Sequence, residues 1–563
     1  MSSSYESYLR GLHNKEQNLV AKKGGGRVRV ALIFPNRYFV AMSNLGFLLV
    51  YRMLAEEFGI EVDRAFLPDD EERKNDPQTK LILTIESRKT LREFDALLFS
   101  VSFENDYLNI LKILYRSGIP PGRGDRDYSH PLVMAGGAAV TINPEPVADF
   151  IDAFALGEGE GLVHDIARVL VTSRDEGYSK EDTLDALSRV SGIYVPGHFD
   201  AAYDEKRRLK RHVNRLGRND RVRVRKNLDF SSFSLSSSIV TPQTEFSDMF
   251  LVEVERGCPF SCAFCVTPSL YSPVRMRNFD EIIRDIDIGI EKTGKVGLIG
   301  PAIVKHPEID RIFRHIRERD AQLGLPSLRT ELISEEGIDI LAGLGIKTLT
   351  LAPESGSEDV RRALGKNISD DDFMRVAVEA VRRGINNFRL YFLIGILGER
   401  DEDVFGIVRF SKRLRHVLLH ETGKTGRAGK ITVSVNPLVP KPHTPLMWMG
   451  MDEQKNLEGK IKYLTRHIRE IGNAALIHEP PKWSYIQALL ARGDRSVGEI
   501  LMRALVSGDD WKRAMRETKV NPYYFVLRER ETDEVFPWDF IDMGYEKESL
   551  LQRYLMIKSK LQK

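Results

Sequence analysis

The three cysteines of the chain lie within eight positions, and this clustering constrains the fold around them more than any other feature. They are Cys258, Cys262 and Cys265, and the 563-residue sequence contains no other cysteine. A loop with this CxxxCxxC spacing can present three thiolates to three irons of a 4Fe-4S cluster and leave the fourth iron open to a small molecule. The spacing therefore predicts an iron–sulfur loop with one reactive iron.

Two other interpretations of the cysteines are weaker. Structural cysteines are usually scattered through a chain, so three free buried thiols are not expected this close together. A structural zinc site normally takes four protein ligands. The next histidine, His306, is far along the chain and does not have the spacing of a zinc knuckle.

The motif resembles the signature of the radical SAM superfamily, in which an aromatic residue precedes the third cysteine, as Phe264 does here. The resemblance implies that S-adenosylmethionine binds the open iron through its amino and carboxylate groups. An electron from the cluster then cleaves it to a 5'-deoxyadenosyl radical, which the protein directs to a substrate. It also implies an electron donor such as flavodoxin or ferredoxin.

Composition and charge indicate an ordinary globular chain of roughly three to four domains. The 83 basic and 81 acidic residues give a net charge of +2, so no global field favours nucleic acid or membrane. The sequence has no apolar run of about 18 residues, and its start lacks the basic and apolar segments of a secretory signal. We therefore expect a cytoplasmic protein without a membrane span.

Short apolar strands alternate with helical stretches, which predicts an α/β fold with parallel sheets. Long amphipathic stretches follow and predict a helical C-terminal region. We expect a flexible leader (1–27), a Rossmann-like doubly wound domain that binds cobalamin (28–200), a basic linker (201–245), a partial (β/α)6 TIM barrel (246–445) and a helical cap (446–563).

Two runs in the first of these domains, 134–146 with its Gly-Gly turn and Asn-Pro-Glu, and 156–160 with Gly-Glu-Gly-Glu, resemble the cobalamin-binding domain of cobalamin-dependent radical SAM proteins. In a doubly wound sheet, ligands bind at the loops beyond the strand carboxyl ends. The residues that this resemblance assigns to cobalamin are Ser43, Asn44, Ser102, Gly136, Gly137, Asn143, Gly157 and Glu158.

No histidine occurs between His13 and His130, so the loop after the first strand has none to offer the cobalt. We therefore predict that cobalamin is bound without a histidine lower ligand. His130 and His164 remain as alternatives, and each is more typical of a surface or helix position. A domain that has lost cobalamin is also compatible with the sequence.

The stretch 203–226 contains eleven basic and three acidic residues. Such a patch is typical of a phosphate-binding surface for RNA. Its Arg-Val alternation also fits a hairpin with a charged, solvated face. We favour the hairpin, because aromatic residues for base stacking are missing.

In the barrel, residues at the strand carboxyl ends are expected to line the site. The expected strands are 250–254, 296–299, 325–330, 348–351, 387–393 and 431–435, and helices are expected at 279–290 and from Ser369 onward. The superfamily usually has a Gly-Gly-Glu-like turn after the second strand, but the turn at Gly300 has no acidic residue. The further candidates for binding S-adenosylmethionine or substrate are Arg329, Glu354, Ser355, Gly356 and Tyr391.

Each of these candidates also has a plainer interpretation. Glu354 could be a solvated residue at a helix start. Arg329, whose fork could clamp a carboxylate, could instead form an interior ion pair with Glu354 or Glu331. Tyr391 could simply pack in the barrel.

The predicted function is a cobalamin-dependent radical SAM methyltransferase that acts on an unactivated carbon, with no particular substrate indicated. A radical rearrangement or ring closure is the alternative. A cluster and cobalamin sensor that binds RNA is an alternative of another class. The absence of a second cysteine cluster argues against a methylthiotransferase, which needs further cysteines for an auxiliary cluster.

Overall fold

The computed structural model describes residues 4–21, 26–68, 81–205, 208–423 and 429–562. The chain divides into two compact units, each of which combines parallel strands with helices. Unit 1 is Met1–Asp248, Leu489–Phe525 and Asp533–Tyr545, and unit 2 is Met249–Ala488, Val526–Thr532 and Glu546–Lys563.

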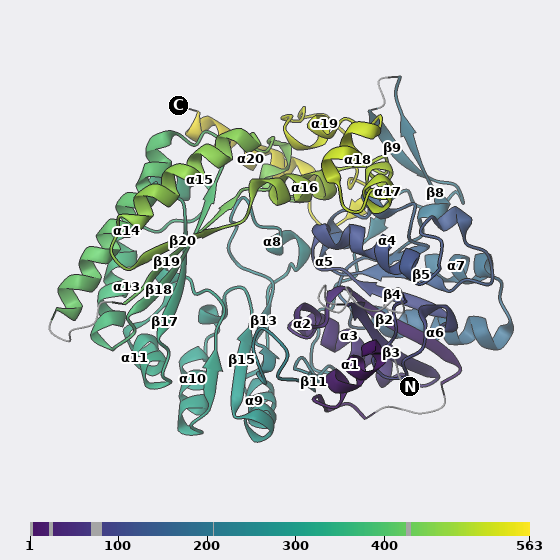
Figure 1. The fold of residues 1–563 in the computed structure, drawn as a ribbon, viewed down its shortest axis with the longest axis horizontal. Helices are drawn as coiled ribbons and strands as arrows, with labels where there is room; N and C mark the ends of the chain where they lie inside the picture. The colour runs from purple at the N-terminus through teal and green to yellow at the C-terminus, as the bar shows by residue number, and fades with distance from the viewer. Residues whose placement is uncertain (1–3, 22–25, 69–80, 206–207, 424–428, 563) are drawn as a thin grey trace. The chain divides into compact units, whose positions relative to one another are not determined.

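Unit 1 is built on a six-stranded sheet with the order β3-β2-β4-β5-β6-β7 (Figure 1). Its first five strands are parallel and β7 is antiparallel to β6. The strand order reverses between β2 and β4, which makes their carboxyl ends the topological switch point of the sheet. The strands are β2 (Val28–Arg37), β3 (Ile60–Leu67), β4 (Ala96–Ser100), β5 (Leu132–Gly136), β6 (Ala153–Ala155) and β7 (Ile193–Tyr194).

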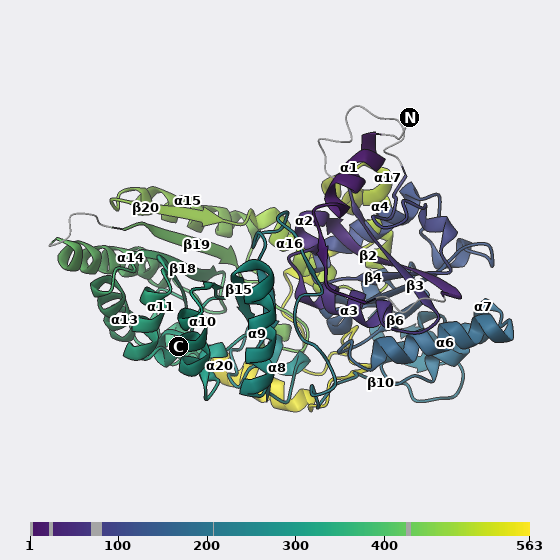
Figure 2. The ribbon, with the colours of Figure 1, turned by 90° about the horizontal axis from the view of Figure 1, so that it is seen from below.

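Helices cover both faces of this sheet, so its central strands read as continuous apolar runs. Figure 2 shows α3 (Leu45–Ala55) and α6 (Leu162–Glu176) on one face, with α4 (Tyr107–Arg116) and α17 (Val497–Val506) on the other. The other helices of this part are α1 (Ser4–His13), α2 (Tyr38–Ala41), α5 (Ala138–Ile142), α7 (Lys180–Ser188), α18 (Trp511–Glu517) and α19 (Pro522–Val526).

The expected flexible leader, residues 1–27, contains a packed helix and a short strand in the described residues 4–21, and the prediction is corrected for those residues. Helix α1 buries Tyr5, Leu9 and Leu12, which lie three and four residues apart on one face. Glu16 then forms a buried ion pair with Arg64 of β3 at 2.6 Å. The sequence did not predict this helix because most of the residues between its three apolar side chains are polar.

The expected basic linker, 201–245, is part of unit 1. Strands β8 (Phe199–Tyr203) and β9 (Leu209–Asn214) form an antiparallel hairpin. Strand β10 (Val222–Arg223) pairs in parallel with β21 (Ile541–Asp542). The short strands β1 (Gln17–Asn18) and β11 (Ile239–Val240) also pair. Backbone pairing therefore holds this segment to residues far away in the chain.

Unit 2 contains a three-stranded sheet, β12-β15-β16, and a four-stranded sheet, β17-β18-β19-β20, both parallel. A single bridge between Leu328 and Leu351 connects them. The strands are β12 (Phe250–Glu253), β15 (Lys295–Ile299), β16 (Gln322–Gly324), β17 (Thr348–Glu354), β18 (Asn387–Ile394), β19 (Ile431–Pro437) and β20 (Ala474–His478), with the short pair β13 (Glu255–Arg256) and β14 (Arg275–Met276).

Helices α13, α14 and α15 lie along the outside of the four-stranded sheet in Figure 1. The helices of unit 2 are α8 (Thr267–Leu270), α9 (Phe279–Thr293), α10 (Ile309–Glu318), α11 (Glu335–Gly343), α12 (Glu358–Ala363), α13 (Asp370–Arg382), α14 (Asp401–Thr422), α15 (Gln454–Arg469), α20 (Lys547–Leu561) and most of α16 (Pro481–Arg492). The two helices expected from the sequence are present. Ser369 caps α13 with a capping box that includes Asp372.

Two expected features of unit 2 are corrected. The third strand is Gln322–Gly324 and not 325–330, because Pro326 has no N–H to continue the ladder. The region 446–563 is not one helical cap: β20 extends the four-stranded sheet, and residues of this region belong to both units. No helix in the described part of the chain is long and apolar enough to cross a membrane.

Candidate functional site

The three cysteines lie on the loop 257–265, called the cysteine loop here, which follows β12 and β13 at a strand carboxyl end. Gly257 opens the loop with φ +85°, and a Cβ there would come within 2.4 Å of the Tyr271 carbonyl oxygen. Glycine is therefore required at this turn. All three thiols are free and half-buried. Burial raises the pKa of Cys258 and of Cys265.

Backbone contacts hold the cysteine loop against other parts of unit 2. The Ala263 N–H donates to the Leu364 carbonyl at 2.9 Å, and the Cys265 N–H donates to the Cys262 carbonyl at 3.1 Å. The Arg553 guanidinium of α20 donates to the Ser261 carbonyl. The loop is thus fixed by the residue that caps the end of α12 and by α20, the last helix of the unit.

Arg329 lies beside the cysteine loop and not in a strand. Its Nη1 is 3.6 Å from the Cys262 sulfur, and its guanidinium carbon is 3.6 Å from the centre of the Phe260 ring. Its Nε donates to Glu331 at 2.7 Å. The Glu331 ion pair expected as the plainer alternative is therefore present, and one edge of the fork faces the cysteine.

Glu354 ends β17 with φ +68°, a backbone conformation that is uncommon for a residue other than glycine. Its carboxylate pairs with Lys366 at 2.8 Å. The carbonyl of the buried Ser355 accepts from Arg361 at 2.8 Å, and Gly356 lies against the α14 backbone. These contacts hold the turn in a strained, fixed shape at a strand carboxyl end.

Glu255, which sequence reasoning missed, places a buried carboxylate against the turn at Gly300. One of its oxygens accepts the Ala302 N–H, and the other is buried without a hydrogen-bond partner among the described residues. Burial raises the pKa of Glu255 to about 7. In the sequence, Glu255 is recognisable only as an acidic residue three positions before the first cysteine. Composition and spacing alone do not distinguish such a residue from an ordinary strand residue.

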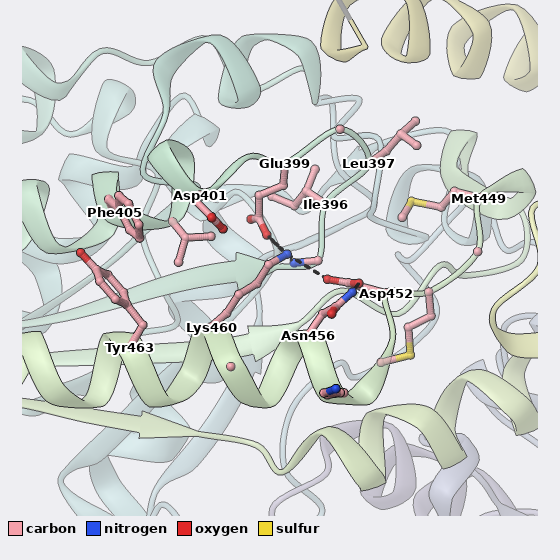
Figure 3. A pocket seen from close by; sticks show the side chains of 17 residues that line it. Ile396, Leu397, Glu399, Asp401, Phe405, Met449, Asp452, Asn456, Lys460 and Tyr463 are labelled. Carbon is pink, nitrogen blue, oxygen red and sulfur yellow. Dashed lines mark hydrogen bonds and ion pairs between the residues drawn. The ribbon is translucent and has the colours of Figure 1, made fainter.

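A hollow of about 740 Å³ lies between the segment that follows β18, the start of α14 and helix α15 (Figure 3). Lys460 of α15 points across it and pairs with Glu399 at 2.7 Å and Asp452 at 2.9 Å. The hollow contains none of the predicted site residues. Tyr391, also on β18, is half-buried. The charged groups of the hollow, Glu399 and Lys460, are already paired with each other, whereas the cysteine loop carries free thiols.

In unit 1, the switch point is bridged by side chains that the sequence singled out. The Asn44 amide donates to the Ser102 hydroxyl at 3.0 Å, and its oxygen caps α3 by accepting from the Phe47 N–H. The Ser43 hydroxyl donates to the Phe39 carbonyl. Two aromatic residues near these side chains are not among the predicted site residues. They are Phe39 and Phe103, which are 48% and 57% exposed.

Other predicted cobalamin residues make contacts within unit 1. The Asn143 amide donates to the Ala491 and Gly493 carbonyls at 3.0 and 2.8 Å. A Cβ on Gly157 would lie 2.1 Å from the Arg225 carbonyl oxygen, and Glu158 accepts from the Asn227 N–H. Gly136 ends β5, and Gly137 follows it with φ +109°. Asn143, Gly157 and Glu158 therefore each make a structural contact within unit 1, and their predicted role in binding cobalamin stays a prediction.

The two alternative histidines have partners of their own. His130 precedes β5, at the amino ends of the strands, and pairs with Asp127 at 2.9 Å. His164 of α6 pairs with Glu57 at 2.6 Å. Each imidazole ring is thus paired with a carboxylate, and neither pairing supports a role as the lower ligand of cobalt.

Asp106 is a buried acid next to the switch point. Its Oδ1 accepts from the Asn36 and Asn109 amides at 2.8 and 3.2 Å, and burial raises its pKa to about 7. The neutral carboxyl is therefore favoured in the folded protein below a pH of about 7. The stability that this gives is complete below the ordinary pKa of 3.8 and is lost as the pH rises through 7.

We expect Asp106→Asn, which keeps the accepting Oδ1, to remove this pH dependence. Between pH 5 and pH 8 the wild type should lose about 3 kcal/mol more unfolding free energy than the variant. Urea unfolding of the cofactor-free protein at several pH values measures the difference. Parallel pH profiles for the two proteins would show that Asp106 is ionised throughout.

The donor set of the cysteine loop fits an iron–sulfur cluster. Three half-buried thiols lie on one anchored loop, with a guanidinium beside the middle one. Among the described residues, no three His, Cys, Asp and Glu side chains, these cysteines included, are arranged around a single metal ion. A 4Fe-4S cluster instead takes each thiolate on a separate iron. The switch point of unit 1 fits a flat group with an apolar face, because exposed aromatic rings flank its polar Asn44 and Ser102.

The chain is similar to known proteins over much of its length. It is 27% identical to the uncharacterized protein MJ0966 of Methanocaldococcus jannaschii, over 84% of this chain and 90% of that protein. It is 24% identical to the uncharacterized methyltransferase PH0819 of Pyrococcus horikoshii, over 50% of this chain and 58% of that protein.

Among solved structures, it is similar to the radical S-adenosylmethionine methyltransferase TsrM from Kitasatospora setae, with a TM-score of 0.47 and 15% identity, over 75% of this chain and 74% of that one. At such a score and identity, the likeness assigns no ligand or reaction to this chain.

Two family models match separate parts of the chain. The model described as radical SAM proteins, N-terminal, matches residues 46–196. The model described as the radical SAM superfamily matches residues 252–411, which include the cysteine loop. Together the two matched segments make up more than half of the sequence. The chain belongs to the radical SAM superfamily.

Proposed function

We propose that the chain is a radical SAM enzyme in which Cys258, Cys262 and Cys265 hold a 4Fe-4S cluster. The observation that carries the proposal is the anchored loop of three half-buried thiols at a strand carboxyl end of a radical SAM domain. When bound, such a cluster supplies the electron that cleaves S-adenosylmethionine to a 5'-deoxyadenosyl radical. The protein residues would bind this cofactor, orient it and exclude water.

The turns around the cysteine loop are the proposed binding site for S-adenosylmethionine. Gly300 and the strained Glu354-Ser355-Gly356 turn offer backbone groups and a carboxylate for its amino group and ribose hydroxyls. Phe264 offers an apolar face next to the third cysteine. Tyr391, on β18, is the proposed substrate contact. Fixed turns of this kind orient a ligand because little conformational entropy is lost when it binds.

Unit 1 is the proposed cobalamin domain, with Ser43, Asn44, Ser102 and the Gly136-Gly137 turn as its contacts. The switch point and its flanking aromatic rings support this assignment. Methyl transfer to an unactivated carbon is the proposed reaction, and a relative that is named a methyltransferase supports it. Radical rearrangement or ring closure on the same scaffold would use the same cysteine loop without transferring a methyl group.

The test is anaerobic purification with iron and sulfide, incubation with hydroxocobalamin, and analysis of iron, cobalt and 5'-deoxyadenosine. We expect about four irons and one cobalt per chain, with S-adenosylmethionine cleaved when dithionite supplies electrons. Iron without cobalt would overturn the assignment of unit 1 and leave the radical chemistry standing. A protein that holds no iron would overturn the whole proposal.

A further inference from the structure

We propose that Arg329 and Arg553 raise the reduction potential of the cluster through Cys262, and that Glu331 opposes this effect. The inference rests on the proposed function, because it needs a cluster on the cysteine loop. It assigns to Arg329 a role that differs from clamping the carboxylate of S-adenosylmethionine. The two arginines act as positioning and tuning residues, since they contact the loop and not the reacting atoms.

The first reason is the geometry of Arg329, which fixes its cation against one sulfur. The guanidinium carbon stacks 3.6 Å above the Phe260 ring centre, on the cysteine loop itself. Glu331 binds the Nε edge at 2.7 Å and also contacts Nη2, so the side chain is held from the opposite side. The remaining Nη1 points at the Cys262 sulfur at 3.6 Å.

The second reason is a further guanidinium at the same cysteine. Arg553 of α20 donates to the carbonyl of Ser261, the residue before Cys262. Two cations from distant parts of unit 2 therefore meet at the middle cysteine.

The physical consequence follows from charge. Reduction adds one electron to a cluster that already carries three thiolates, so nearby positive charge favours the reduced form. Hydrogen bonds to the sulfurs and local charge are general determinants of iron–sulfur potentials. Each guanidinium should therefore make the potential less negative. The Glu331 carboxylate partly cancels the Arg329 charge, so its removal should shift the potential in the same direction as an added cation.

The experiment is a redox titration of the reconstituted, cobalamin-free holoprotein, followed by electron paramagnetic resonance of the reduced cluster. The variants are Arg329→Met, Arg553→Met and Glu331→Gln. The matched control is Arg383→Met, because Arg383 is also half-buried but pairs with Asp339 and Glu379 of unit 2. Iron content is measured for every variant first.

We expect each of the two Arg→Met changes to lower the ratio of reduced to oxidised cluster about tenfold at a fixed potential. For one electron this corresponds to a shift of about 59 mV to more negative values. Glu331→Gln should raise the ratio roughly threefold, by the same charge argument. The Arg383→Met control should leave the midpoint where it is in the wild type.

Unchanged midpoints in iron-replete Arg329→Met, Arg553→Met and Glu331→Gln proteins would overturn the inference and leave the proposed function intact. If Arg329→Met fails to retain iron, the Arg553 and Glu331 variants decide the question. A wild type that holds no iron would instead defeat the proposed function itself, so the two failures are distinguishable. A merely structural role for the arginines would change stability and iron retention, but not shift the midpoint in opposite directions.

Discussion

Cys262→Ala is expected to reduce the iron content of the reconstituted protein from about four per chain to nearly zero. The reason is that a cluster with one open iron has only three protein ligands, so the loss of one leaves two adjacent irons without a protein ligand. Formation of 5'-deoxyadenosine should fall to background. Iron analysis, the visible spectrum and product formation under dithionite measure the effect.

Ser261→Ala is the matched control for this change. Ser261 lies on the same loop with an exposed side chain, and it is the Ser261 carbonyl that binds Arg553. We therefore expect this variant to retain iron and cleavage. Full iron content in Cys262→Ala, or in the equivalent variants of Cys258 and Cys265, would show that the cysteines do not ligate a cluster.

Arg64→Met is expected to destabilise unit 1 by about 3–5 kcal/mol, the range for removal of one partner from a buried ion pair. The Arg64 side chain is fully buried and joins Glu16 and Glu86, each at 2.6 Å, with the Tyr51 ring 4.9 Å away. Methionine keeps an unbranched apolar stem but has no guanidinium, so the two carboxylates lose the cation between them. Hydrogen exchange of the β2 and β3 amides measures the loss.

Arg27→Met tests whether burial is the cause. Arg27 also pairs with a carboxylate, that of Asp175, but the two side chains are 48% and 40% exposed. Exposed pairs contribute about 1 kcal/mol or less, so β2 and β3 should keep nearly their wild-type protection. Equal losses for Arg27→Met and Arg64→Met would contradict the assignment of the effect to buried charge.

The sequence carries the parts of the fold that depend on local spacing. The Ser369 capping box and the apolar stripe of α9 are set by residues three and four positions apart, and both are present. Family membership depends on the same kind of signal, because the cysteine spacing is local. Such features are visible without any knowledge of the tertiary structure.

Contacts between distant residues are what the sequence could not supply. The run around Asn143 resembles a ligand loop, yet its amide binds carbonyls of residues 491 and 493. Glu16 lies in a polar stretch, and it is held in place by Arg64, which is 48 residues later in the chain. Glu255 is noticeable only when the turn at Gly300 is folded against it. In each case the partner, and not the residue itself, determines the role.

The division of the chain has a consequence for its synthesis. The polypeptide passes between the two units after residues 248, 488, 525, 532 and 545. Arg495, which binds the buried Glu145 of unit 1, therefore leaves the ribosome only after the strands of unit 2. The first 248 residues therefore complete the packing of unit 1 only after residues 489–525 and 533–545 have been synthesised. Neither unit is a contiguous cassette that a gene fusion could carry into another protein.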